Sequence, residues 1–456
     1  MGFEGELASY ESIRRIMSNE KIQQFVKQIK VKDDLSSVFD NIKEKLIQQE
    51  SLESNNNQQP DWIIAIDGGR DEVPILKGFP CASYGYVTVS SVLMDLKKIN
   101  ELEGEKFPNP IEVRKTETAV GIDAVFPGCN VFIDDNEEPK AFLRRTLFEE
   151  LCNHRSFANG ESVLETYEYL LAKRLQNNEC KQKCPISECE DCEIKLQLGS
   201  FTCPYSSQPL YSTDALRIHE NMSQDGSNLG IFTQIMSVLE KLWLVNILRS
   251  FEKSGYLPIL RQVAFVVDGP LAVFDTAAWL SQYIGEEIAR INAKQKEINK
   301  QDLIIVGLEK SGAFVEHFEK LDISDSGERG RFPNGYAFLL NDDYIKQNIE
   351  ISTSKKPYGK ATYFGRKLFY KTASGQRLVP VIASYSDNER NILTADIAQF
   401  SRLKDIMQLL DKLISSRYPN SITPLISAHA HAAIPQMGQK LFEELAKEIR
   451  ERDKNV

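Results

Sequence analysis

The chain has 456 residues, of which 42% are hydrophobic and 26% are charged, and its 55 Lys and Arg residues against 65 Asp and Glu residues give a net charge of −10. This composition excludes collagen-like, coiled-coil and fully disordered proteins, and the length suffices for roughly two to four domains or one large domain with insertions. The acidic balance also excludes a global basic field, so any contact with DNA or RNA must be local or be delivered by a partner.

We expect a cytoplasmic protein that makes no membrane contact. The first six residues, MGFEGE, lack the basic and apolar regions of a secretory signal. No segment reaches the ~18 uncharged apolar residues of a membrane helix, and the most apolar region, 262–280, carries two aspartates.

The predicted elements alternate between helices and strands. Residues 1–50 are expected to be helical, because apolar side chains recur every three to four residues over 12–29, and a polar linker follows at 51–60. Strands are predicted at 62–66, 84–96, 130–133, 263–267, 303–306, 337–340, 368–370 and 379–384, and helices at 142–152, 162–175, 232–251, 276–297, 396–415 and 439–451. The alternation predicts an α/β fold.

Two apolar strands are each followed by an aspartate and a glycine. Asp67 follows IIAI, and Asp268 follows AFVV. An aspartate at the carboxyl end of a buried strand lies at the rim of the sheet, where α/β proteins bind ligands, and two such carboxylates can share Mg²⁺ or Mn²⁺. The alternative for either aspartate alone is an ordinary turn, with Gly68 or Gly269 allowing a tight reversal after the strand.

Glu240 is a third candidate acid, because it lies in an apolar helical segment among Met236, Trp243 and Leu244. A carboxylate in such surroundings is unfavourable without a cation. The alternative is that Glu240 and Lys241 form the one wet strip of this helix.

Two of the five histidines, His429 and His431, lie in the sequence SAHAHA near the C-terminus. Imidazole binds metals when neutral and phosphate when protonated. On a strand both rings would share one face, whereas on a helix only one would face the site, and the other would be an ordinary surface or core histidine.

Residues 351–386 contain seven cations and no acid, with aromatic residues between them. Such a strip suits phosphate contact with base stacking, and the alternative is a solvated hairpin whose edges are guarded by lysine. Lys310 follows a buried strand and also suits a phosphate. The candidate DNA-binding residues are Lys310, Lys355, Lys356, Lys360, Tyr363, Arg366, Lys367 and Lys371.

Five of the eight cysteines fall within residues 180–203. This crowding suits a structural zinc site of four thiolates. Cys189 and Cys192 form a C-x2-C pair, but Cys203 is followed by Ser206 where a regular ribbon has cysteine. The expected ligands are Cys184, Cys189, Cys192 and Cys203, with Cys180 as a substitute.

The sequence resembles the NurA nucleases, which act on DNA ends with the HerA translocase. The resemblance is carried, in the family's order across residues 62–432, by IDGGR at 66–70, the Glu240 helix, VVDGPL at 266–271, GLEKS at 307–311 and Ala428-His429. Two departures stand out. Gly69 replaces the serine that often follows the first Asp-Gly, and a cysteine-bearing insertion lengthens the chain between the acidic motifs, which leaves Glu149 or Glu150 as an alternative to Glu240.

The resemblance implies an RNase H-like core and a Mn²⁺- or Mg²⁺-dependent nuclease that cuts DNA from ends and in single strands. It implies Asp67, Glu240 and Asp268 as metal ligands and His429 as a further active-site residue. It also implies a hexameric HerA-like ATPase as partner, and we expect a homodimer. The expected domains are an N-terminal helical region (1–50), a nuclease core (61–175 and 214–456) and a cysteine-rich, zinc-ribbon-like insertion (176–213).

The favoured hypothesis is metal-assisted phosphodiester hydrolysis in DNA repair or defence. One rival is a non-catalytic adaptor that docks another nucleic-acid enzyme through the zinc module. A second is a zinc-dependent hydrolase of small molecules built on His429 and His431. The absence of G-x-x-x-x-G-K-[ST] excludes a P-loop ATPase.

Overall fold

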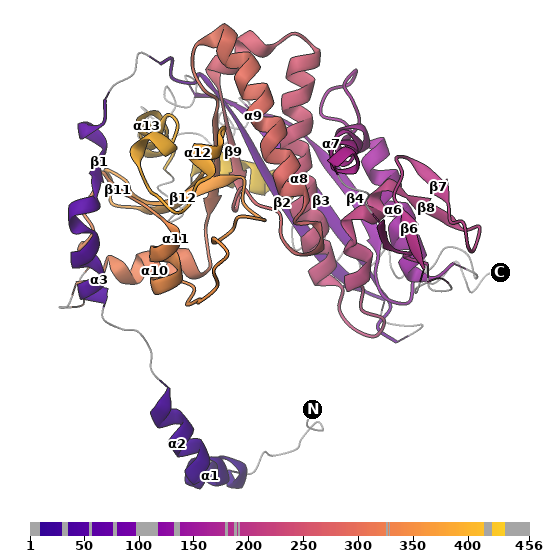
Figure 1. The fold of residues 1–456 in the computed structure, drawn as a ribbon, viewed down its shortest axis with the longest axis horizontal. Coiled ribbons are helices and arrows are strands. Elements are labelled where there is room, and N and C mark those ends of the chain that lie inside the picture. The colour runs from indigo at the N-terminus through magenta and orange to yellow at the C-terminus, as the bar shows by residue number, and fades with distance from the viewer. Residues whose placement is uncertain are drawn as a thin grey trace.

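A nine-stranded mixed sheet forms the centre of the molecule (Figure 1). The computed structural model describes residues 10–29, 35–53, 57–75, 80–96, 117–131, 137–177, 181–186, 189, 192–324, 327, 329–414 and 422–433. The strands of the sheet, in spatial order, are β1 (Ile47–Gln48), β11 (Tyr336–Leu339), β12 (Gly365–Lys371), β13 (Arg377–Ala383), β10 (Ile304–Glu309), β9 (Val263–Asp268), β2 (Trp62–Pro74), β3 (Ser83–Asp95) and β4 (Glu117–Pro127).

The sheet changes from antiparallel to parallel at its middle. Strands β2, β3 and β4 form an antiparallel meander, β9 runs parallel to β2, and β10 runs parallel to β9. Beyond β10 the pairing is antiparallel again, through β13, β12, β11 and β1. The parallel pairing sets Ile66 opposite Val267, so Asp67 and Asp268 follow side by side on neighbouring strands.

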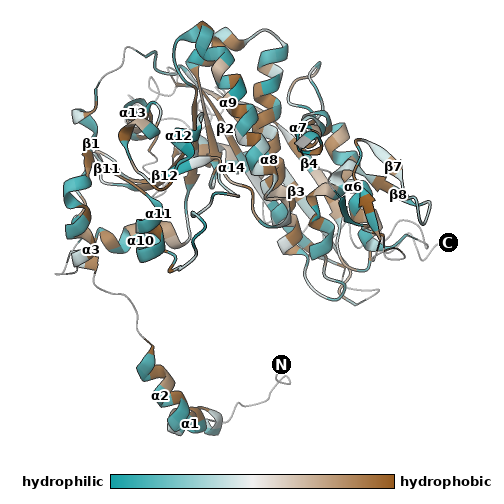
Figure 2. Cartoon of the chain, viewed as in Figure 1, coloured by the Kyte–Doolittle hydropathy of each residue, from teal (hydrophilic) through white to brown (hydrophobic). Residues whose placement is uncertain are grey.

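Helices cover both faces of the sheet and explain its continuous apolar runs. The described helices are α1 (Glu11–Ser18), α2 (Glu20–Gln28), α3 (Leu35–Ile42), α6 (Pro139–Asn153), α7 (Val163–Asn177), α8 (Leu229–Lys253), α9 (Leu280–Asn299), α10 (Ala313–Leu321), α11 (Asp342–Asn348), α12 (Asp387–Arg390), α13 (Leu403–Leu413) and α14 (Thr423–Ala432). Hydrophobic residues line the central strands, and the helices carry polar residues as well (Figure 2). The fold is therefore α/β, as the sequence predicts.

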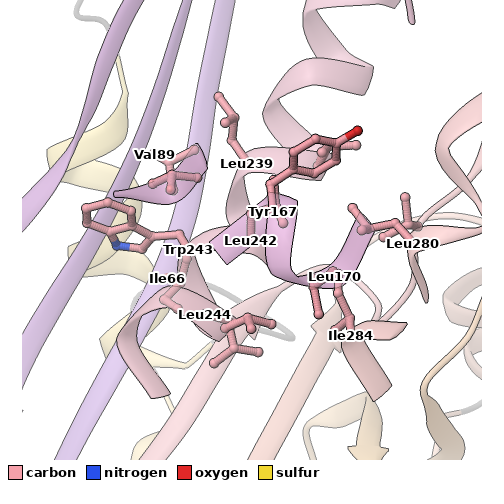
Figure 3. Packing of buried hydrophobic residues seen from close by; sticks show 14 of the residues in the cluster. Ile66, Val89, Tyr167, Leu170, Leu239, Leu242, Trp243, Leu244, Leu280 and Ile284 are labelled. Atoms are coloured by element: carbon pink, nitrogen blue, oxygen red, sulfur yellow. The ribbon is translucent and has the colours of Figure 1, made fainter. Parts of the chain in front are cut away.

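The larger core lies between the sheet and helices α7, α8 and α9. Ile64 and Ile66 of β2 pack there with Trp243 and Leu242 of α8 (Figure 3). Helix α8 is long and apolar enough to cross a membrane by length and composition, but 83% of its most apolar window is buried inside the protein. Its hydrophobicity is thus explained by its place in the core.

The opposite face of β2 packs against α13 and α14. Ile63 and Ala65 belong to the cluster that contains Leu410 and Leu425. Since side chains alternate across a strand, Asp67 projects to this second face, together with Ile63 and Ala65.

Most predicted strands and helices are confirmed, but three are not. Helix α13 begins at Leu403 rather than at 396, because a short 3-10 helix (Ile397–Gln399) precedes it. Where a strand is expected at 130–133, Asn130 lies in a turn and residues 132–133 lie outside the described residues. The helix expected at 439–451 also lies outside them. Helices α1 and α2 agree with the prediction, contain no buried residue and lie away from the sheet (Figure 1).

Strand β2 does not end at Asp67, which corrects the predicted turn. The strand runs on through Gly68 and Gly69 to Pro74, paired with β3 throughout. Both glycines are needed for space, because a Cβ on Gly68 would lie 2.6 Å from Glu240 Oε1 and one on Gly69 would lie 2.3 Å from the carbonyl oxygen of Ala432. The two glycines thus allow helices α8 and α14 to approach strand β2 closely. The turn prediction holds at Gly269, whose φ is +71°.

Candidate active site

Three acidic side chains lie near the point where β2 and β9 run side by side, and the charges of Asp268 and Glu240 both act on Asp67. Asp67 and Asp268 project from adjacent strands, Asp67 almost fully buried and Asp268 partly exposed. Glu240 is buried on α8. It approaches from the opposite face of the sheet, through the space that Gly68 leaves open. A residue with a side chain at position 68 would close this passage.

The structure leaves the alternative acids elsewhere. Glu149 and Glu150 lie on α6, which contacts β4 and α7 rather than the β2–β9 pair. Their carboxylates contact Arg145 at 3.8 Å and His154 at 3.0 Å, respectively. Of the acids considered from the sequence, Glu240 is therefore the one placed beside the two aspartates.

Two lysines and one histidine contact the acidic cluster. Lys310, which follows β10, places Nζ 2.7 Å from Oδ1 of Asp268 and 3.9 Å from Oδ2 of Asp67. Lys241 places Nζ 2.7 Å from Oε2 of Glu240 and 3.4 Å from the carbonyl oxygen of Asp268. The wet-strip interpretation of Glu240 and Lys241 is wrong, because both side chains are buried.

His429 is the histidine of α14 that faces the cluster. Its Nδ1 lies 3.2 Å from Oδ2 of Asp67, while 61% of the side chain remains exposed. His429 and His431 lie on a helix, so their side chains point about 200° apart around its axis and cannot converge on one metal ion. This geometry removes the observation on which the zinc-hydrolase hypothesis depends.

The electrostatics of the cluster favour a bound cation. The pKa of Asp67 is raised to about 8, first by burial and then by the charge of Asp268, with Lys310 opposing the shift. Burial also raises the pKa of Glu240, against the opposing charge of Lys241. Among the described residues no donor makes a well-directed hydrogen bond to the buried Oδ2 of Asp67. A divalent cation fits this set of oxygen donors, because it would satisfy that atom and offset the crowded negative charge.

Lys241 is the residue of this cluster that the sequence analysis missed as a functional group. The available signal was a lysine in the middle of an otherwise apolar helical run, next to Glu240. A buried ammonium requires a partner, so this position marks a site of concentrated negative charge.

Comparison with known proteins supplies the family. Residues 62–434 match the sequence profile of the NurA domain. The chain belongs to the NurA family. The predicted resemblance is thereby confirmed, and with it the assignment as a nuclease. No curated protein sequence matches the chain.

Solved NurA structures are among its structural relatives. A crystal structure of the NurA nuclease from Sulfolobus solfataricus has 13% identity and a TM-score of 0.33, with 98% of each chain covered. A crystal structure of NurA has 10% identity and a TM-score of 0.27, covering 93% of this chain and 94% of the other. A crystal structure of NurA with manganese has 12% identity and a TM-score of 0.24, covering 98% and 99%.

The basic strip of this NurA-family chain is divided between surface and interior. Lys355, Lys356 and Lys360 are exposed, Lys310 is partly exposed, and Tyr363 is partly buried. The strip therefore offers its free cations on the loop before β12.

The three cations of β12 are not available for DNA, which corrects the sequence-based expectation. Lys371 and Lys367 are buried and pair with Asp322 and Glu309, each at 2.8 Å. Arg366 is buried too and donates hydrogen bonds to backbone carbonyl groups, among them that of Leu340. Because removing a charge from water costs free energy, each of these buried cations needs a partner inside the protein.

A cleft of about 390 Å³ opens beside the acidic cluster. Asp268, Lys310, Phe274 and Tyr363 are among its lining residues. Phe274 is 40% exposed, and its ring packs edge-on against that of Tyr363 with the centroids 5.6 Å apart. The cleft therefore places a carboxylate, an ammonium group and an exposed aromatic ring next to one another.

The cysteine-rich segment places three of its sulfur atoms together. The Sγ atoms of Cys184, Cys189 and Cys203 all lie within 4.8 Å of one another, and Cys192 borders the same cluster. Burial raises the pKa of Cys184 to about 11. Cys180 lies outside the described residues.

Proposed function

We propose that this NurA-family protein is a divalent-metal-dependent nuclease that hydrolyses phosphodiester bonds in DNA, at ends and in single strands. The observation that carries the proposal is the convergence of Asp67, Glu240 and Asp268 around a buried, unsatisfied carboxylate oxygen. Mn²⁺ or Mg²⁺ suits these oxygen ligands. The order β4-β3-β2-β9-β10, three antiparallel strands followed by two parallel ones, supports an RNase H-like core.

In the proposed mechanism Asp67, Asp268 and Glu240 hold the metal. When bound, the metal lowers the pKa of a coordinated water and offsets the charge that develops on the phosphate. Lys241 fixes Oε2 of Glu240, which leaves Oε1 directed at the Gly68 passage.

The remaining residues act on the substrate. His429 keeps Nδ1 against Asp67 and presents the rest of its ring to solvent, where it can orient water or donate to the scissile phosphate. Lys310 neutralises Asp268 in the free protein and is near enough to the cleft to bind a backbone phosphate. Phe274 offers a surface on which a base can stack.

The wider assembly follows from the family and the charge of the chain. We propose a cytoplasmic homodimer that receives its strand from a HerA-like hexameric ATPase, in DNA repair or defence. The net charge of −10 supports delivery by a partner, because only Lys310 and the exposed lysines 355, 356 and 360 remain of the proposed DNA-binding cations. Residues 61–175 and 214–456 would form the nuclease core.

The test is cleavage of linear single-stranded, linear duplex and circular DNA with Mn²⁺, Mg²⁺ or EDTA. Asp67→Asn and Asp268→Asn should each lower the rate by at least about 100-fold, because direct ligands matter more than the outer partners whose loss costs about 10–100-fold. Glu297→Gln, on the exposed side of α9, is the matched control and should cleave normally.

Metal-dependent cleavage that survives both aspartate substitutions would overturn the proposed site. A folded protein that cleaves none of these substrates, alone or with its ATPase, would favour the adaptor hypothesis instead.

A further inference from the structure

The cysteine-rich segment has a core made largely of sulfur-bearing side chains. It contains two hairpins of very short strands, β5 (Lys181–Lys183) with β6 (Glu193–Lys195) and β7 (Ser200–Thr202) with β8 (Pro209–Tyr211). Its buried cluster consists of Cys184, Cys189, Cys203, Ile186, Ile194 and Leu210, with Cys192 and Phe201 packed against it. So few aliphatic side chains cannot hold four such strands, and units of this size usually rely on disulfides or a metal.

The spacing of the sulfur atoms matches tetrahedral metal coordination. The Sγ atoms of Cys184 and Cys203 are 3.7 Å apart. A tetrahedron with Zn–S distances of ~2.3 Å has edges of ~3.8 Å, whereas a disulfide requires ~2.05 Å. Cys189 lies within 4.8 Å of both. One edge therefore matches a zinc tetrahedron, and the third sulfur lies close enough to occupy another corner.

Cys192 is the candidate for the fourth sulfur ligand. Its N–H donates to the carbonyl oxygen of Cys189 at 2.8 Å, and its own carbonyl accepts from the N–H of Cys184 at 2.8 Å. These two bonds link the backbones of three of the cysteines. The side chain of Cys192 is only partly buried and packs on the sulfur cluster, which makes it the candidate for the fourth corner.

We propose that Cys184, Cys189, Cys192 and Cys203 bind one structural zinc ion that forms the core of this segment. Four thiolate ligands select Zn²⁺ over the oxygen-preferring Mn²⁺ and Mg²⁺ of the acidic cluster. A closed set of four protein ligands leaves no open position for substrate, so the ion stabilises the segment and takes no part in catalysis.

The end of the cysteine-rich segment is anchored onto helices α6 and α7. Arg144 of α6 forms a buried, bidentate ion pair with Asp214, with both N–O distances 2.7 Å. Gln182 of β5 donates to the carbonyl oxygen of Asp214, and Tyr167 of α7 donates to that of Ser212. Strands β6, β7 and β8 lie beside α6 at the periphery of the molecule (Figure 1). Loss of zinc should loosen this anchorage and leave the acidic cluster in place.

Elemental analysis of the full chain, purified without chelators, tests the assignment. We expect one zinc ion per chain in the wild type, and less than about a fifth of that in Cys189→Ser and in Cys192→Ser. Cys81→Ser and Cys152→Ser replace exposed cysteines outside the cluster and should keep the full zinc content. Replacement by Co²⁺ should give the visible absorption of a tetrahedral tetrathiolate site.

Four results would overturn the proposal: no zinc in the wild type and no uptake by chelated protein, iron in place of zinc, a cobalt spectrum without thiolate coordination, or undiminished zinc in Cys192→Ser. If Cys189→Ser does not fold, the cobalt spectrum of the wild type still decides the coordination. The zinc measurement does not use DNA cleavage, so it stands or falls separately from the nuclease proposal.

Discussion

The two clusters of side chains that we propose to bind metals are built in opposite ways. The carboxylates of Asp67, Asp268 and Glu240 are fixed by β2, β9 and α8, elements that pack into the large hydrophobic cores on the two faces of the sheet. The cysteines belong to strands of three residues with few aliphatic neighbours. A large core can hold like charges together without an ion, whereas a small one cannot fold without it. In the two proposals the first metal would therefore supply chemistry, and the second would supply stability.

Filling the space at Gly68 should have the largest effect on the acidic cluster. In Gly68→Ala the new Cβ would meet Glu240 Oε1 and Met236 Cγ, each at 2.6 Å, so the carboxylate must move. We expect cleavage to fall by about 100-fold or more, as for loss of a metal ligand, while the zinc content stays unchanged. Gly230→Ala on the same helix as Glu240 is the control, since nothing lies within 4 Å of its Cβ. Normal cleavage by Gly68→Ala would show that Glu240 does not reach the site through this gap.

Removing the ammonium group of Lys241 should have a smaller effect. Lys241→Met leaves the buried Glu240 carboxylate without its partner at 2.7 Å, so the carboxylate is free to rotate away from the metal. We expect the Mn²⁺ concentration for half-maximal cleavage to rise by about 10–100-fold, which is typical for loss of an outer-sphere partner. Lys241→Arg keeps the charge and should restore most of the affinity. If both variants need the same Mn²⁺ concentration as the wild type, Lys241 has only a packing role.

Much of this site follows from local sequence, and the rest depends on tertiary contacts. The apolar runs predict β2, β9, β10 and α8. The position after such a run correctly predicts the end of the strand for Asp268 but not for Asp67, which lies in the middle of β2. The extension of β2 through two glycines was not predictable, since glycine disfavours strands and the reason for it lies on α8 and α14. Local pattern therefore predicts the elements, and contacts between distant residues decide which of them meet.

The basic strip shows the same limit, because there the local pattern predicts an exposed segment and the structure buries it. Its alternation of cations and aromatic residues is typical of an exposed hairpin, but β12 is an interior strand with both faces covered. The partners of Lys367 and Lys371 are Glu309 and Asp322, which are remote in sequence. Helix α14 is likewise not among the predicted helices. The family resemblance names His429 of this helix as an active-site residue, and the structure places it against Asp67.

The pH dependence of stability tests whether the acidic cluster is held together against its own charge. Asp67 has a folded pKa of about 8, above its ordinary 3.8, so between these values the folded state binds more protons than the unfolded state and stability falls as pH rises. His219 is buried with its pKa lowered to about 4, and its opposite contribution ends near pH 6.5.

Without added Mn²⁺ or Mg²⁺, the wild type should therefore lose roughly 1.5 kcal/mol between about pH 6.5 and 8 relative to Asp67→Asn. Differential scanning calorimetry on the two proteins should show this as a Tm difference of a few degrees that Mn²⁺ removes at about pH 8. Parallel melting curves of the two proteins across this range would contradict a buried, uncompensated carboxylate at Asp67.

The smallest effect is expected from the exposed lysines, whose charges no packing holds in place. Replacing Lys355, Lys356 and Lys360 by Gln should weaken binding of single-stranded DNA only a few-fold at physiological salt. The slope of log K against log salt should become shallower by about 0.7 for each phosphate that the variant no longer neutralises. Lys412→Gln, at an exposed position of α13, is the control for loss of a lysine away from this loop. A change in affinity without a change in slope would mean that these lysines act on the fold of the loop before β12, and that the strand reaches the cleft by Lys310 and Phe274 alone.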